Sequence, residues 1–179
     1  GTMWVFLALF VTTLWAFRGI IPAPGLGFVA ICALIALTET VPFVADRLMA
    51  AHLPGFISTL VFPLAWAALD FAARWSPYGT WGSAAYAQYG NLPLMQLASV
   101  TGTPGIAFLI AWFAAVANGT AEMNFDWHLS QDGLFVFVYA LVWSTVMLFG
   151  GARLAFAQTA AKSVRCATIG WPEGLITPA

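Results

Sequence analysis

The residues that could do chemistry in this sequence are few, and they lie close to long apolar runs. Asp70 and Arg74 are four positions apart, so on a helix they share a face and can neutralise each other. Such a pair can anchor the end of a helix at a membrane surface. Alternatively, Arg74 can present its guanidinium group to a phosphate or carboxylate head group.

Glu39 is another ionisable residue beside an apolar run, with Thr38 and Thr40 next to it. A charged side chain is costly at the centre of a bilayer unless it is paired or hydrated. We therefore expect Glu39 to need a partner, and Arg18 in the preceding apolar segment is the candidate. A structural ion pair is the favoured interpretation, and a functional polar site is the alternative.

Several other kinds of site are not expected. Cys32 lies in an apolar run and Cys166 in the polar tail, so a disulfide framework is not predicted. Neither His52 nor His128 has cysteine or carboxylate neighbours at metal-ligand spacing, and we predict no metal and no cofactor. The net charge is -1 without a basic run, so the sequence has no electrostatic footprint for nucleic acid.

The composition indicates which elements must position these residues. The chain is 61% hydrophobic and 7% charged, whereas a soluble domain carries about 25% charged residues. Because a membrane crossing needs about 20 apolar residues, the apolar runs predict five spanning helices separated by proline, glycine or polar breaks. The expected spans cover residues 3–21, 26–43, 54–75, 104–117 and 134–156. An aromatic-rich loop over residues 76–92 suits a membrane–water interface.

The chemistry of the chain changes after Lys162. Residues 164–169 alternate in character and are rich in β-prone types, which predicts a strand just outside the last span. We therefore expect a multi-pass transmembrane domain over residues 1–160 and the beginning of a second domain over residues 161–179. The predicted fold class is an all-α integral membrane helical bundle followed by the start of a truncated α/β domain.

Four motifs carry a resemblance to a known family. They are FPLAWAALDF at 62–71 followed by Arg74-Trp75, AYAQ at 85–88, PLMQLASVTG at 93–102 followed by Gly105, and VRCATI at 164–169. Together they resemble the bacterial apolipoprotein N-acyltransferases, in the family's order and at compatible spacing. The last motif resembles the first strand of that family's nitrilase-type, or carbon–nitrogen hydrolase, domain.

The resemblance implies a multi-pass enzyme of the bacterial inner membrane with a periplasmic nitrilase-type domain. In that family a Glu-Lys-Cys triad acts. The cysteine takes an acyl chain from a membrane phospholipid as a thioester and passes it to the α-amine of a lipoprotein's N-terminal cysteine. The implied partners are phospholipid and lipoprotein. We expect this chain to be inactive alone, because the catalytic Lys and Cys of the family are not in it.

The resemblance also implies candidate site residues. WPE at 171–173 resembles the family's Trp-Pro-Glu, which makes Glu173 a candidate general base; a loop residue after the strand is the alternative. The candidates for binding the lipid substrate are Arg74, Trp81, Tyr86 and Gln88.

Two other functions remain open. The chain can be the membrane anchor of a nitrilase-type amidase that never acts on lipoproteins. It can also be a small transporter or channel that uses Glu39, Asp70 and Arg74 along a polar path. The sequence contains no evident inverted repeat, which argues against transport.

The basic residues oppose the topology that the resemblance implies. The family places the strand after the last span outside the membrane, so Arg18, Arg74 and Arg153 would lie near the outer side and Arg47 inside. Basic residues usually gather on the inner side. We follow the resemblance for the topology.

Overall fold

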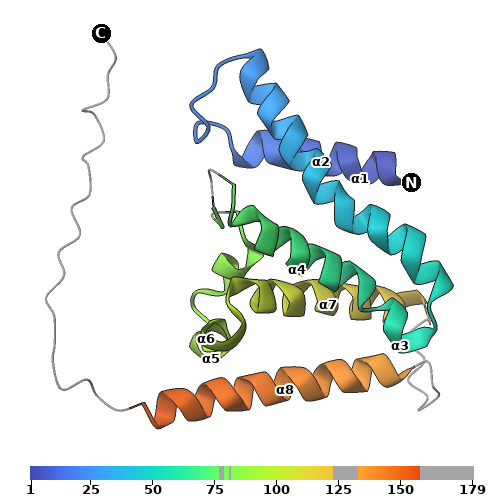
Figure 1. Cartoon of the computed structure of the whole chain (residues 1–179), viewed down its shortest axis with the longest axis vertical. Helices are drawn as coiled ribbons and strands as arrows, with labels where there is room; N and C mark the ends of the chain where they lie inside the picture. The colour runs from blue at the N-terminus through green and yellow to red at the C-terminus, as the bar shows by residue number, and fades with distance from the viewer. Residues whose placement is uncertain (77–78, 81, 123–132, 158–179) are drawn as a thin grey trace, which may run out of the picture.

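A computed structural model describes residues 1–76, 79–80, 82–122 and 133–157, and these residues contain helices and no strand (Figure 1). The long helices are α1 (Thr2–Ala16), α2 (Leu26–Met49), α4 (Val61–Ala73), α7 (Thr103–Glu122) and α8 (Leu134–Ala155). The short ones are η1 (Ala50–His52), α3 (Gly55–Ser58), η2 (Ala84–Gln88), α5 (Leu92–Met95) and α6 (Ala98–Thr101). The predicted all-α membrane bundle is therefore confirmed.

Some predictions lie outside the described residues. These are the strand over 164–169, the domain starting at 161, and the residues Trp81, His128, Cys166 and Glu173.

Four helical stretches of the described chain are long and apolar enough to cross a membrane. They are Leu26–His52, Gly55–Ala73, Thr103–Ala121 and Leu134–Ala155, and they correspond to four of the expected spans. The helix expected to end at residue 43 continues to Met49 with Pro42 inside it. A proline removes one backbone donor, which membrane helices tolerate.

The first expected span is shorter than predicted. α1 contains 15 residues and ends at Ala16, whereas a crossing needs about 17–25 residues. Beyond Ala16 the backbone forms turns, and Gly19 adopts a φ of 80°. The helical backbone geometry is already lost at Phe17, with φ of -96° and ψ of 5°. The positive φ of Gly19 keeps the helix from resuming, so the apolar run outlasts the helix.

The helices pack in a row, in which α1 contacts α2, α2 contacts α4, α4 contacts α7, and α7 contacts α8 (Figure 1). The buried core lies between α7, α8 and α5, and its largest member is Trp112. The Trp112 indole nitrogen donates a hydrogen bond to the Thr59 hydroxyl at 3.3 Å. Its ring centre also lies 5.2 Å from that of Tyr139 on α8.

Several loops and helix ends gather at one end of the bundle, on the left in Figure 1. Thr103 at the start of α7 donates a hydrogen bond to Asp70 near the end of α4, so these helices are antiparallel. Arg153 near the end of α8 donates to the Ser99 hydroxyl on α6. We call this end the motif end, because two of the sequence motifs lie there. It is formed by residues 17–25, 74–76, 82–102 and 153–157.

Candidate functional site

The expected ion pair between Asp70 and Arg74 is not formed. Asp70 is only 8% exposed, and its Oδ2 accepts a hydrogen bond from the Thr103 hydroxyl at 3.5 Å. The Arg74 guanidinium carbon instead lies 5.3 Å from the centre of the Phe71 ring. Among the described residues, no carboxylate oxygen comes within 4.0 Å of Arg74. Asp70 therefore joins α4 to α7, and Arg74 is exposed without a counter-charge.

Arg74 lies against the backbone of a second motif. A Cβ built on Gly102 would be 2.5 Å from Arg74 Nη2, so the guanidinium occupies the space of a missing side chain. Gly102 follows α6 and has a φ of 70°, a conformation that other L-residues adopt only at a cost. The glycine thus permits both the turn and the close approach of Arg74. Residues 62–75 and 93–102, two of the motifs, meet at this contact.

Tyr86 and Gln88 both lie on η2, after a turn that Ser83 caps by accepting a hydrogen bond from the Ala85 backbone N–H. The Tyr86 hydroxyl is exposed and bonds with the Thr80 hydroxyl at 2.8 Å. Gln88 lines a cavity of about 490 Å³ against α7 and α8. Its other lining residues are Ile110, Phe113, Tyr139, Ala140, Trp143 and Ser144.

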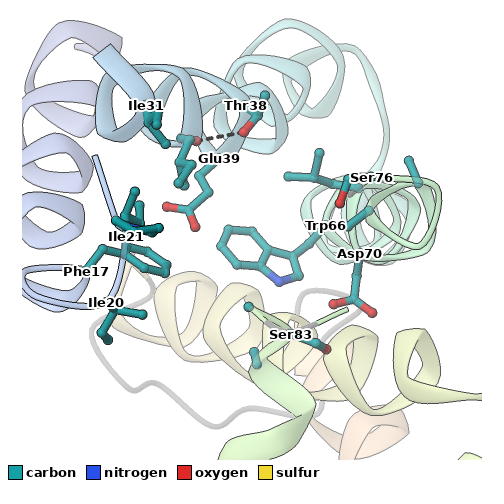
Figure 2. A pocket seen from close by; sticks show the side chains of 17 residues that line it. Phe17, Ile20, Ile21, Ile31, Thr38, Glu39, Trp66, Asp70, Ser76 and Ser83 are labelled. Carbon is teal, nitrogen blue, oxygen red and sulfur yellow. Dashed lines mark hydrogen bonds between the residues drawn. The ribbon is translucent and has the colours of Figure 1, made fainter. Parts of the chain in front are cut away.

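A larger cavity of about 700 Å³ lies between the α1–α2 turn, α2, α4 and the segment before η2 (Figure 2). Its walls are mostly apolar, and the polar exceptions are Thr38, Glu39, Asp70, Ser76 and Ser83. The volume falls within the range of about 300–1,000 Å³ that is usual for small-molecule sites. Sequence reasoning did not find this cavity, because its walls come from segments that meet only in the folded bundle.

Glu39 lies on the wall of the larger cavity, near the middle of the 24-residue helix α2. Figure 2 shows its carboxylate in the cavity, between the side chains of Ile21 and Trp66. The expected partner, Arg18, is exposed beyond the end of α1 and forms no ion pair with Glu39. Phe17, Ile20 and Ile21 of the same turn line the cavity with Glu39, whereas Arg18 is exposed and is not among the lining residues.

No group of three His, Cys, Asp or Glu side chains in the described ranges is arranged to hold a metal ion. The Cys32 thiol is buried and donates a weak hydrogen bond to the Thr13 carbonyl oxygen at 3.9 Å. Neither described cavity is lined by this cysteine. The described part of the chain therefore offers a binding surface at the motif end and a cavity beside it, rather than a nucleophile with its base.

Two comparisons with known proteins give matches. Residues 1–116 match the family model of the apolipoprotein N-acyltransferase N-terminal domain. Over 57 residues the chain is 46% identical to an apolipoprotein N-acyltransferase of Geobacter metallireducens, a match that covers 31% of this chain and 11% of that protein. The matched segment is thus a small part of the relative. No solved structure matches the chain.

Proposed function

The chain belongs to the apolipoprotein N-acyltransferase family, and we propose that it is the membrane portion of an enzyme that acylates lipoproteins. In this proposal the enzyme lies in the bacterial inner membrane and moves an acyl chain from a phospholipid to the N-terminal cysteine of a lipoprotein. Four helices of crossing length make the chain a multi-pass membrane protein. The thioester step needs a cysteine nucleophile and a base. We assign the nucleophile to the nitrilase-type domain expected from residue 161 onward.

The contact between Arg74 and Gly102 is the observation that supports the proposal most strongly. It joins two segments that resemble the family, and it leaves the guanidinium exposed at the end of a membrane helix. A guanidinium can donate two parallel hydrogen bonds to a phosphate group, which suits a phospholipid head group. Arg153 of α8 donates a hydrogen bond to Ser99, three residues before Gly102, so the end of α8 lies near the same contact.

The remaining candidate residues have proposed roles around Arg74. Trp81, Tyr86 and Gln88 would form the aromatic and polar surface that receives the lipid, since Trp and Tyr favour the membrane–water interface. Glu173 would act as the general base. The exposed Tyr86 hydroxyl and the cavity beside Gln88 are consistent with a lipid approaching η2.

The proposal is tested in a longer protein that includes the downstream domain. Arg74→Ala should slow thioester formation from labelled phospholipid at least tenfold, because a hydrogen bond to a charged group contributes about 1.5–3 kcal/mol. Arg74→Lys should restore only part of the rate, since an ammonium group cannot bind a phosphate in the bidentate way. Arg47→Ala is the control, because Arg47 lies in the last turn of α2, away from the motif end. It removes the same charge and should leave the rate of thioester formation unchanged.

Two results would contradict the proposal. Unchanged donor use by Arg74→Ala would remove the assigned role of this residue. A labelled thioester on the 179-residue chain alone would show that its nucleophile lies within residues 1–179 rather than in the downstream domain.

A further inference from the structure

We propose that the 700 Å³ cavity binds an amphiphile that carries a protonated amine. The ammonium group would lie between the Glu39 carboxylate and the Trp66 indole, and the apolar part would lie along the isoleucines of α2 and the α1–α2 turn. This inference rests on the lining of the cavity and does not depend on the function proposed above.

The first argument is the charge of the cavity. Glu39 and Asp70 line it, whereas none of its described lining residues is Lys, Arg or His. Asp70 has one partner, the Thr103 hydroxyl. The Glu39 side chain makes no hydrogen bond or ion pair within the described part of the chain.

The Glu39 oxygens are also reachable. Every fully buried side-chain oxygen or nitrogen among the described residues has a hydrogen-bond partner. Because the Glu39 oxygens have no partner, they are not fully buried, and Figure 2 shows them facing the cavity. A carboxylate near the middle of a membrane helix is costly unless a counter-charge or water meets it. A ligand cation supplies the counter-charge that the lining residues lack.

Trp66 provides a second group that favours a cation. Indole is the aromatic ring that attracts cations most strongly. The ring is held by neighbours, with centroids 5.7 Å from Phe62 and 6.3 Å from Phe43. Figure 2 shows Trp66 extending from α4 toward the Glu39 carboxylate. A carboxylate and an indole on opposite helices are the chemistry that recognises an ammonium group.

The rest of the cavity requires an apolar part in the ligand. A water molecule occupies about 30 Å³, so a bare small cation would leave most of the volume to water against apolar walls. These walls include Phe17, Ile20, Ile21, Ile31, Ile35 and Leu69. Burying an alkyl chain along them is favourable, because it removes apolar surface from water. Ser76 and Ser83 form a polar part of the wall near the motif end.

The test measures binding to the full chain in micelles of a neutral detergent by isothermal titration calorimetry, with empty micelles subtracted. The probes are n-octylammonium, n-octanol and ethylammonium. Octylammonium should bind at least tenfold more tightly than either of the others. Glu39→Gln should reduce octylammonium affinity to that of octanol, and Trp66→Phe should weaken it several-fold while leaving octanol unchanged. Asp46→Asn removes the same charge from α2 outside the cavity and should have no effect on binding.

Glu39→Gln keeps the size of the side chain, and circular dichroism verifies that each variant folds. Equal affinities for octylammonium and octanol in the unmodified chain would overturn the proposal, as would a preference that survives Glu39→Gln. Ethylammonium binding as tightly as octylammonium would show that the cavity recognises a small cation and no amphiphile.

Discussion

The contact between α8 and α5 leaves no room for a side chain at Gly150, and this makes a sharp prediction. A Cβ at Gly150 would lie 1.9 Å from the Pro93 carbonyl oxygen and 2.5 Å from its carbonyl carbon. Both are backbone atoms, which cannot rotate aside as a side chain would. Restoring ordinary contact requires α8 to move away by roughly 1 Å or more, at the usual overpacking cost of about 1–3 kcal/mol. Gly150→Ala should therefore lower the free energy of unfolding by that amount relative to Gly151→Ala, a change in the same helix that brings the same gain in helix propensity.

The neighbouring glycine provides the matched control. A Cβ at Gly151 meets nothing within 4 Å, and alanine is a better helix former than glycine by up to about 1 kcal/mol. Gly151→Ala should therefore be neutral or stabilising. The assay is unfolding in mixed micelles with a rising fraction of denaturing detergent, followed by circular dichroism. Equal midpoints for Gly150→Ala and Gly151→Ala would refute the close packing of α5 on α8.

Two further changes test the contacts at the motif end and in the core. Gly102→Ala should lower the free energy of unfolding by about 1–2 kcal/mol, because an L-residue resists the positive φ and its Cβ meets the Arg74 guanidinium. Gly90→Ala is the control, because a Cβ there meets nothing within 4 Å. Trp112→Phe and Thr59→Val should each lose the 3.3 Å hydrogen bond, and a double-mutant cycle in the same assay should give a coupling of about 0.5–1.5 kcal/mol. A coupling near zero would argue against that bond.

The spans were predictable because the length of an apolar run is a local property of the chain. The exception was the first span, where Gly19 turns the backbone within an apolar segment. Spacing alone also failed for Asp70 and Arg74. Their four-residue spacing places them on one helix face, but Asp70 accepts a hydrogen bond from Thr103 on α7. Arg74 follows the last residue of α4 and packs on Gly102. Competing neighbours from distant segments decide such contacts, and a four-residue spacing does not encode them.

The binding surfaces were less predictable for the same reason. Arg74 could be named because a positive residue at a helix end beside an aromatic loop is visible in the sequence. The cavity around Glu39 depends on how α1, α2 and α4 pack together, so the sequence offered only an unpaired acid and a wrong partner, Arg18.

The arginines at the motif end reconcile the charge distribution with the proposed topology. Arg18, Arg74 and Arg153 lie at this end, and Arg47 lies near the opposite end of α2. If every arginine is counted, the tendency of basic residues to lie on the cytoplasmic side would place the motif end in the cytoplasm. The family resemblance instead places the end of α8 outside. Arg74 packs on Gly102, however, and Arg153 donates to Ser99. Contacts within the fold account for two of these arginines whichever side they face. Lys162 and Arg165 lie outside the described residues. Among the described residues, setting Arg74 and Arg153 aside leaves Arg18 at the motif end and Arg47 at the other end, so the remaining described arginines carry no net bias against an outward-facing motif end.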